Sequence, residues 1–105
     1  MINLGKKFKV PFLGAYENRN STKAVEPPAY LIRSVVEKFN NGLLQQTLSD
    51  ISKLLHRYPR SATLYNIKGA TDARLGKPDA ALEAFTNAIS INPRSEEAYN
   101  NMGNI

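Results

Sequence analysis

The sequence predicts an all-α protein in which antiparallel helix pairs follow one another along the chain. The tripeptide Pro-Arg-Ser at residues 59–61 recurs at 93–95, a shift of 34 positions. The same shift joins five further pairs of identical residues: Gly42 and Gly76, Leu48 and Leu82, Tyr65 and Tyr99, Asn66 and Asn100, and Gly69 and Gly103. Gly and Pro residues also interrupt apolar runs of helical spacing at regular intervals. A period of this length is typical of a helix-turn-helix repeat.

The first expected pair covers residues 28–61, with helices near 28–41 and 44–58. Its apolar residues recur at spacings of three and four: Tyr30, Leu31, Val35 and Phe39, then Leu44, Leu48, Ile51, Leu54 and Leu55. Gly42 ends the first helix, because only glycine takes the left-handed conformation there without strain. Thr47 stands where the second pair has the smaller Ala81, so this copy of the repeat is degenerate.

The second pair, residues 62–95, follows the pattern best, with helices expected near 62–75 and 79–91. Gly76 ends the first of these helices, and Pro78 fits the first turn of the second, where an N–H has no partner. The second helix carries a continuous apolar stripe: Ala81, Leu82, Phe85, Ala88 and Ile89. A further helix is expected over 96–105, with Ser95 as its N-cap. It starts a third pair or caps the array. We expect a longer protein, or self-association through this open end.

Residues 62–95 resemble the tetratricopeptide repeat (TPR) family. The family pattern of an aromatic residue, Leu-Gly, Tyr, Ala, Phe and Pro is met by Tyr65, Lys68-Gly69, Asp72, Ala81, Phe85 and Pro93. Lys68 and Asp72 depart from the apolar residues of the family, while the other positions match or are conservative. The third copy opens similarly at Tyr99. The resemblance extends over residues 28–105 and implies a right-handed superhelical array of about two helix pairs plus one further helix.

The resemblance also implies a binding groove, because the first helix of each pair in that family lines a concave face that holds extended peptides or partner helices. Carried over by position, the groove residues are Ile32, Arg33, Val36 and Asn40, then Thr63, Asn66, Ile67, Ala70 and Arg74, then Glu97, Asn100, Asn101 and Asn104. Asn side chains offer a donor and an acceptor to peptide amides. Residues 99–104 are similar to the Asn-bearing helices of the O-GlcNAc transferase superhelix.

Two function classes follow. The first is a protein–protein interaction module that binds a peptide or a partner helix. The alternative is the substrate-holding N-terminal arm of a longer enzyme, such as a glycosyltransferase or sulfotransferase. RNA binding through the basic N-terminal half is a weaker alternative. The formal net charge is +5, but residues 60–105 hold five basic and five acidic residues and are neutral. The charge gradient therefore gives nucleic acid little support.

Residues 1–27 fit no repeat and are expected to form a disordered or irregular arm. Basic and aromatic residues alternate over 6–12, which suits contact with RNA or an anionic membrane. We favour instead a solvated tail whose hydrophobic patch docks on the helices, because three Lys are few for binding an anionic surface. For RNA binding, only Phe8 and Phe12 are expected to be free for base stacking, because Tyr65, Phe85 and Tyr99 match core positions of the family.

The sequence offers no catalytic constellation, so no catalytic residue, metal site or cofactor is expected. It has no Cys and a single His, His56, which we interpret as a residue near the end of a helix. It contains none of the nucleotide-binding, zinc-protease or calcium-loop motifs. We expect no signal peptide, because no apolar stretch follows the basic residues near the start, and no apolar run reaches the roughly 20 residues of a membrane span. We therefore expect a cytoplasmic protein without intrinsic enzyme activity.

Overall fold

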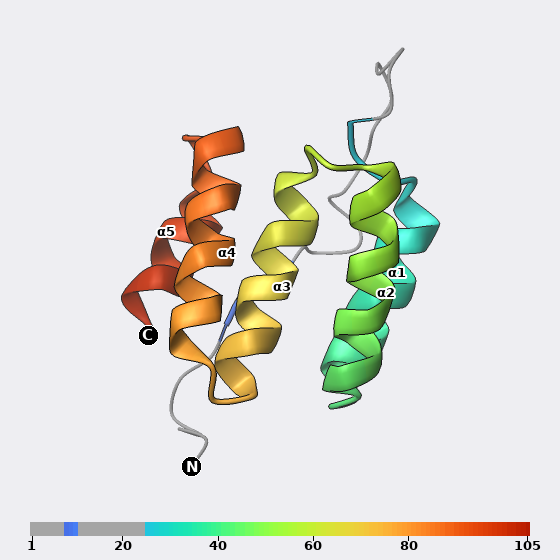
Figure 1. Ribbon diagram of the computed structural model, residues 1–105, viewed down its shortest axis with the longest axis horizontal. Helices are drawn as coiled ribbons and strands as arrows, with labels where there is room; N and C mark the ends of the chain where they lie inside the picture. Colours follow the sequence, from blue (N-terminus) through green and yellow to red (C-terminus); the bar gives the residue numbers. More distant parts are fainter. Residues whose placement is uncertain (1–7, 11–24) are drawn as a thin grey trace.

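The computed structural model describes residues 8–10 and 25–105, and helices account for most of this part of the chain (Figure 1). They are α1 (Ala29–Asn40), α2 (Leu44–Arg57), α3 (Ala62–Arg74), α4 (Pro78–Ile91) and α5 (Glu96–Gly103). The described residues contain no strand, which confirms the predicted all-α class, and the predicted helix ends agree within two residues. No helix in these two ranges is long and apolar enough to span a membrane.

The first helix of each pair ends at a glycine, as predicted. Gly42 and Gly76 both have φ of 77°, a left-handed conformation that strains any residue with a Cβ. Behind Gly76, the N–H of Lys77 donates to the carbonyl of Asp72 at 2.9 Å. This bond closes the last turn of α3 and sends the chain back along α3 as α4.

The start of α3 receives two side-chain caps, one of them from a distant part of the chain. The Ser61 hydroxyl accepts the N–H of Leu64 at 3.0 Å. The Glu26 carboxylate accepts the Ser61 hydroxyl and the N–H of Thr63. A carboxylate near a helix N-terminus is favoured by the helix dipole. Glu26 thereby ties the segment before α1 to the first turn of α3.

Helix α3 lies at the centre of the molecule and contacts each of the other four helices. Figure 1 shows α1 and α2 on one side of α3, with α4 and α5 on the other. The equivalent helices α1, α3 and α5 touch in sequence, whereas α2 and α4 are separated by α3. The right-handed superhelical arrangement stays a prediction.

Two apolar clusters meet along α3. The first is mainly aliphatic and joins α1, α2 and α3 through Ile32, Val35, Val36, Ile51, Tyr58, Leu64 and Ile67. The second joins α1, α3 and α4 through Phe39, Ala70, Ala81 and Phe85. Val10 packs against both clusters. A short stretch near the N-terminus therefore contributes to the apolar packing of the helices.

The second cluster depends on the close approach of α3 and α4. A Cβ built on Gly69 would lie only 2.5 Å from Cε1 of Phe85. The Phe85 ring, fully buried, therefore occupies the space that any larger residue at position 69 would need. Gly69 and Phe85, two positions of the family pattern, thus lie in contact with each other in the structure.

Candidate functional site

Residues 8–10, here named the docked segment, lie against α3 and α5 (Figure 1). The side chains of Phe8 and Val10 are half-buried, whereas that of Lys9 is exposed. The ring of Phe8 stacks on that of Phe85, with centroids 6.4 Å apart and planes 14° from parallel. The segment thus presents the side chains of its outer residues to the core and that of its middle residue to solvent.

The backbone of Lys9 is held by two asparagines, Asn66 of α3 and Asn101 of α5, here named the Asn clamp. The Lys9 N–H donates to Oδ1 of Asn101 at 2.9 Å. The Lys9 carbonyl accepts from Nδ2 of Asn101 at 2.9 Å and from Nδ2 of Asn66 at 3.1 Å. A single residue of the docked segment therefore has both backbone groups paired with side-chain amides.

The clamp is almost fully buried, which makes its pairing energetically important. Asn66 is 4% exposed and Asn101 is 0% exposed, and Nδ2 of Asn101 also donates to Oδ1 of Asn66 at 3.0 Å. Within the described ranges, every buried side-chain nitrogen and oxygen has a partner. A buried amide without a partner costs free energy. The clamp thus requires a group that offers an N–H and a C=O side by side, as a peptide backbone does.

The predicted groove residues divide by their burial. Six are buried: Ile32, Val36, Asn66, Ile67, Ala70 and Asn101. Four are half-buried: Thr63, Arg74, Glu97 and Asn104. Three are exposed: Arg33, Asn40 and Asn100. Asn66 and Asn101 bond to the docked segment, and the other four buried residues belong to the two clusters against which Phe8 and Val10 pack.

The pairing within the clamp differs from the one that the repeat suggests. A shift of 34 makes Asn100 the equivalent of Asn66, but Asn100 is exposed and Asn66 bonds to Asn101. Arg74 is held elsewhere, since its Nη1 donates to the Phe39 carbonyl at 2.9 Å and its guanidinium lies 4.8 Å from the centre of the Phe39 ring. The structure therefore gathers the two clamp residues, and it places Arg74 at the end of α1.

The N-terminal arm corrects one prediction. The expectation that the Phe8 ring is free for base stacking is wrong, because that ring packs on Phe85. Phe12 and most of the predicted disordered arm, 1–7 and 11–24, lie outside the described residues. The favoured interpretation, a hydrophobic patch of the arm that docks on the helices, agrees with the packing of Phe8 and Val10. Alternation of Phe8 and Val10 around a polar residue, followed by Pro11, is the pattern of an extended segment with one apolar face.

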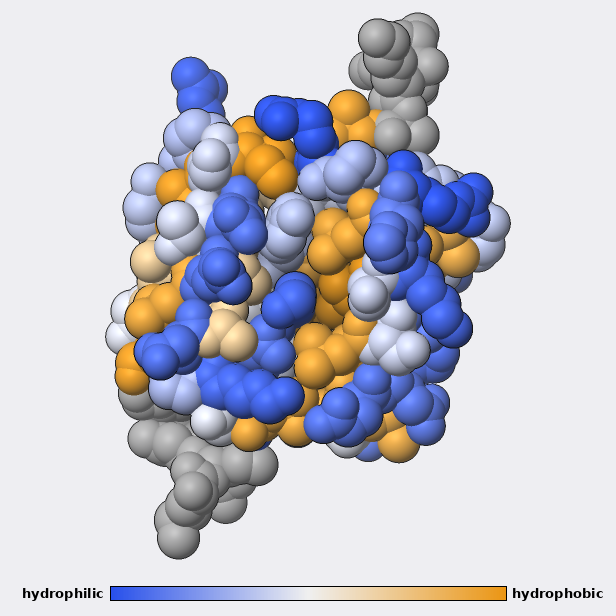
Figure 2. Space-filling model, in the orientation of Figure 1, coloured by the Kyte–Doolittle hydropathy of each residue, from blue (hydrophilic) through white to orange (hydrophobic). Residues whose placement is uncertain are grey.

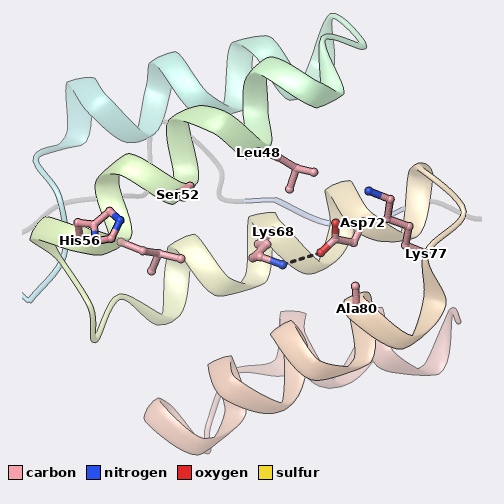
Figure 3. A pocket seen from close by; sticks show the side chains of 8 residues that line it. Leu48, Ser52, His56, Lys68, Asp72, Lys77 and Ala80 are labelled. Carbon is pink, nitrogen blue, oxygen red and sulfur yellow. Dashed lines mark hydrogen bonds and ion pairs between the residues drawn. The ribbon is translucent and has the colours of Figure 1, made fainter.

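A second concave feature lies on another face of α3. A hollow of about 630 Å³ separates α2 from α3 and the start of α4, and Figure 2 shows apolar side chains exposed between these helices. Its lining residues, most of them labelled in Figure 3, are Leu48, Ser52, Leu55, His56, Lys68, Asp72, Lys77 and Ala80. Lys68 Nζ lies 2.8 Å from Asp72 Oδ2.

Lys68 and Asp72 are the two departures from the family pattern, and together they form one ion pair. Asp72 is 2% exposed, and its partner is one helical turn away on the same side of α3. The described part of the chain contains no group of three or more metal-ligating side chains. The lining of the hollow thus combines apolar side chains with one ion pair between Lys68 and Asp72.

Comparison with known proteins leaves the family undecided. No family model matches the chain, and no solved structure matches it. The resemblance to tetratricopeptide repeats stays a prediction that rests on the residues quoted above. The hydrogen bonds between the Asn clamp and the backbone of Lys9 are therefore the observation that points to a function.

Proposed function

We propose that this chain is a protein-interaction module that holds an extended peptide segment between α3 and α5. The observation that carries the proposal is the Asn clamp, whose two buried amides make three hydrogen bonds to the backbone of Lys9. Recognition through the backbone and through flanking side chains is the general mode by which extended peptides are bound.

The chemistry of the clamp favours a peptide over other partners. A neutral amide pair matches the N–H and C=O of one residue. A phosphate or a carboxylate has acceptors only and would leave Oδ1 of Asn101 without a donor. RNA as a partner is less well supported, because Phe8 is packed on Phe85 and residues 60–105 carry no net charge. The clamp therefore distinguishes ligand classes by its hydrogen-bonding pattern.

The proposal includes a tetratricopeptide-like array. It is supported by the shift of 34 residues, by the two glycines with the same φ, and by the successive contacts of α1, α3 and α5. In such an array the docked segment would lie on the concave face. If the chain belongs to a longer enzyme, the same groove would hold the substrate polypeptide, so both notions of function use one site.

Selection of peptides from a random displayed library tests the proposal. The full chain is used as bait, both unchanged and as the Phe8→Ser/Val10→Ser variant, in which the docked segment is weakened. The selected peptides are then measured on two further variants, Asn101→Ala and Asn100→Ala. We expect at least about tenfold weaker binding to Asn101→Ala, since one lost buried hydrogen-bond pair costs about 1–3 kcal/mol.

Asn100→Ala is the matched control, because Asn100 is the neighbouring asparagine on the same helix and is exposed. Its affinity for the selected peptides should equal that of the unchanged chain. Failure to select any peptide on either bait would contradict the proposal. Equal binding to Asn101→Ala and Asn100→Ala would also contradict it, because the peptides would then bind elsewhere.

A further inference from the structure

We propose that the groove reads an aromatic residue and an aliphatic residue on either side of a backbone-clamped residue, and that residues 8–10 are a resident copy of this motif. A partner peptide of the form aromatic-x-aliphatic would bind by displacing the chain's own segment. This inference rests on the proposed function, and it adds a ligand class and a means of regulation.

The first position of the motif is defined by the surroundings of Phe8. Its ring stacks nearly parallel on that of Phe85 and packs against the cluster that contains Ala70 and Ala81. Small residues on α3 and α4 leave room there for a flat ring, and paired aromatic rings gain beyond their buried area. An aliphatic residue at this position would fill the same place without the ring contact.

The third position is defined by Val10. It is half-buried and packs on both apolar clusters, where α1 and α3 approach each other. β-branched residues favour an extended backbone, and so does a position that precedes a proline such as Pro11. An extended backbone places the first and third side chains on one side, facing the helices, which agrees with the burial of the two residues.

The middle position is read only through its backbone. The three hydrogen bonds of the clamp engage the N–H and carbonyl of Lys9, while its side chain is exposed. The groove therefore accepts any residue that has a backbone N–H here. Proline is excluded, because it lacks the donor that Oδ1 of Asn101 requires.

The resident copy controls access to the groove. Residues 11–28 connect it to α1, so the segment competes as a covalently tethered ligand. Ligands that belong to the same chain as their site commonly reach effective concentrations in the millimolar range. The apparent affinity of a free peptide falls in proportion to the fraction of time that the groove is empty. A segment docked for nine-tenths of the time would weaken an outside peptide about tenfold.

The test uses a fluorescently labelled synthetic peptide of residues 6–13 and measures its anisotropy with the full chain. Three proteins are compared: the unchanged chain, Phe8→Ser/Val10→Ser, and, as a control that also removes one lysine, Lys53→Ala at an exposed position of α2. A second peptide carries serine in place of the Phe and Val of the motif. All titrations are repeated at higher salt, because the peptide is basic and screening removes non-specific attraction. Circular dichroism melts verify that each protein is folded.

We expect Phe8→Ser/Val10→Ser to bind the native-sequence peptide at least about tenfold more tightly than the unchanged chain does. It should also prefer that peptide to the serine peptide by at least about tenfold, whereas Lys53→Ala should behave as the unchanged chain. Equal binding of both peptides, or no binding of either, would overturn the motif. Equal affinity of the variant and the unchanged chain would overturn the displacement. These failures leave the library selection and its dependence on Asn101 intact, so they are distinguishable from failure of the proposed function.

Discussion

Helix α3 buries a polar side chain on each of two faces, and the two side chains find their hydrogen-bonding partners in different ways. On the face toward α5, Asn66 is 4% exposed and bonds to residues 57 and 35 positions away. On the face toward α2, Asp72 is 2% exposed and pairs with Lys68, four positions away in the same helix. Both satisfy the requirement that buried polar groups be paired, but only the first needs another part of the chain.

This difference separates a recognition site from a local packing solution. Both partners of the Lys68–Asp72 pair belong to α3, so the pairing of Asp72 needs no other part of the chain. The Asn clamp is completed by a peptide backbone that lies across it, and without that backbone its amides must find other hydrogen-bond partners. If the two faces differ in their contribution to stability, substitutions at the clamp should lower the free energy of unfolding more than substitutions on the face toward α2.

The largest effect is expected for Phe85→Ala, which removes the ring that supports the docked segment. Phe85 is fully buried between Gly69 and Phe8, so its truncation should lower the free energy of unfolding by about 3–5 kcal/mol. Urea denaturation followed by circular dichroism measures this. Leu82→Ala on the same helix is the control, because Leu82 is exposed and should lose well under about 1.5 kcal/mol. Equal losses would show that the second cluster is not a core.

A smaller loss is expected for Asn101→Ala, which breaks the clamp itself. The substitution leaves the Lys9 N–H and Oδ1 of Asn66 without their partners, at a cost of about 1–3 kcal/mol. Hydrogen exchange at the Lys9 amide should accelerate at the same time, because that amide loses its acceptor. Asn100→Ala should change neither measurement. An unchanged exchange rate in Asn101→Ala would mean that the clamp does not hold the segment.

The local part of this architecture could be predicted from the sequence. Gly42 and Gly76 locate the turn within each helix pair because a positive φ is a property of one residue, and the Pro-Arg-Ser tripeptides at 59–61 and 93–95 mark the joints between successive pairs. The placement of Asn66 and Asn101 in one groove came from the resemblance to a repeat family. Lys68 and Asp72 stand out in the sequence as departures from the apolar residues of the family pattern. Their spacing of four on a helix is also the spacing of an ion pair.

The nonlocal part could not be predicted. The bond between Lys9 and Asn101 joins residues 92 positions apart, and periodicity describes only neighbours on one element. The partner of Asn66 is Asn101 and not its equivalent by the repeat, Asn100, because the pairing depends on how α3 and α5 approach each other. The sequence favours a hydrophobic patch of the arm that docks on the helices, but the groove that receives this patch emerges only from the packed helices.

The opposite face of α3 should respond far less than the clamp. Asp72→Leu removes the carboxylate, and the Lys68 side chain, 35% exposed, can extend into water. A partly exposed pair contributes about 0.2–1 kcal/mol, and a leucine beside Leu48 and Leu55 regains apolar burial. We expect the free energy of unfolding to stay within about 1 kcal/mol of the unchanged chain. A loss above about 2 kcal/mol in denaturant titration would make this pair as important as the clamp.

The smallest effect is expected for Lys9→Ala, and it isolates the backbone of the clamped residue. The side chain of Lys9 is exposed, so its removal should change stability by no more than about 0.5 kcal/mol. Lys9→Pro at the same position should be clearly worse, because proline deletes the N–H that donates to Oδ1 of Asn101 and leaves a buried acceptor unpaired. The comparison uses thermal melts of both variants together with the amide signals of Asn66 and Asn101 in NMR spectra. Those signals should move in Lys9→Pro and stay in place in Lys9→Ala. If Lys9→Ala moved them as far as Lys9→Pro, the side chain would take part in docking, and the middle position of the motif would no longer be free.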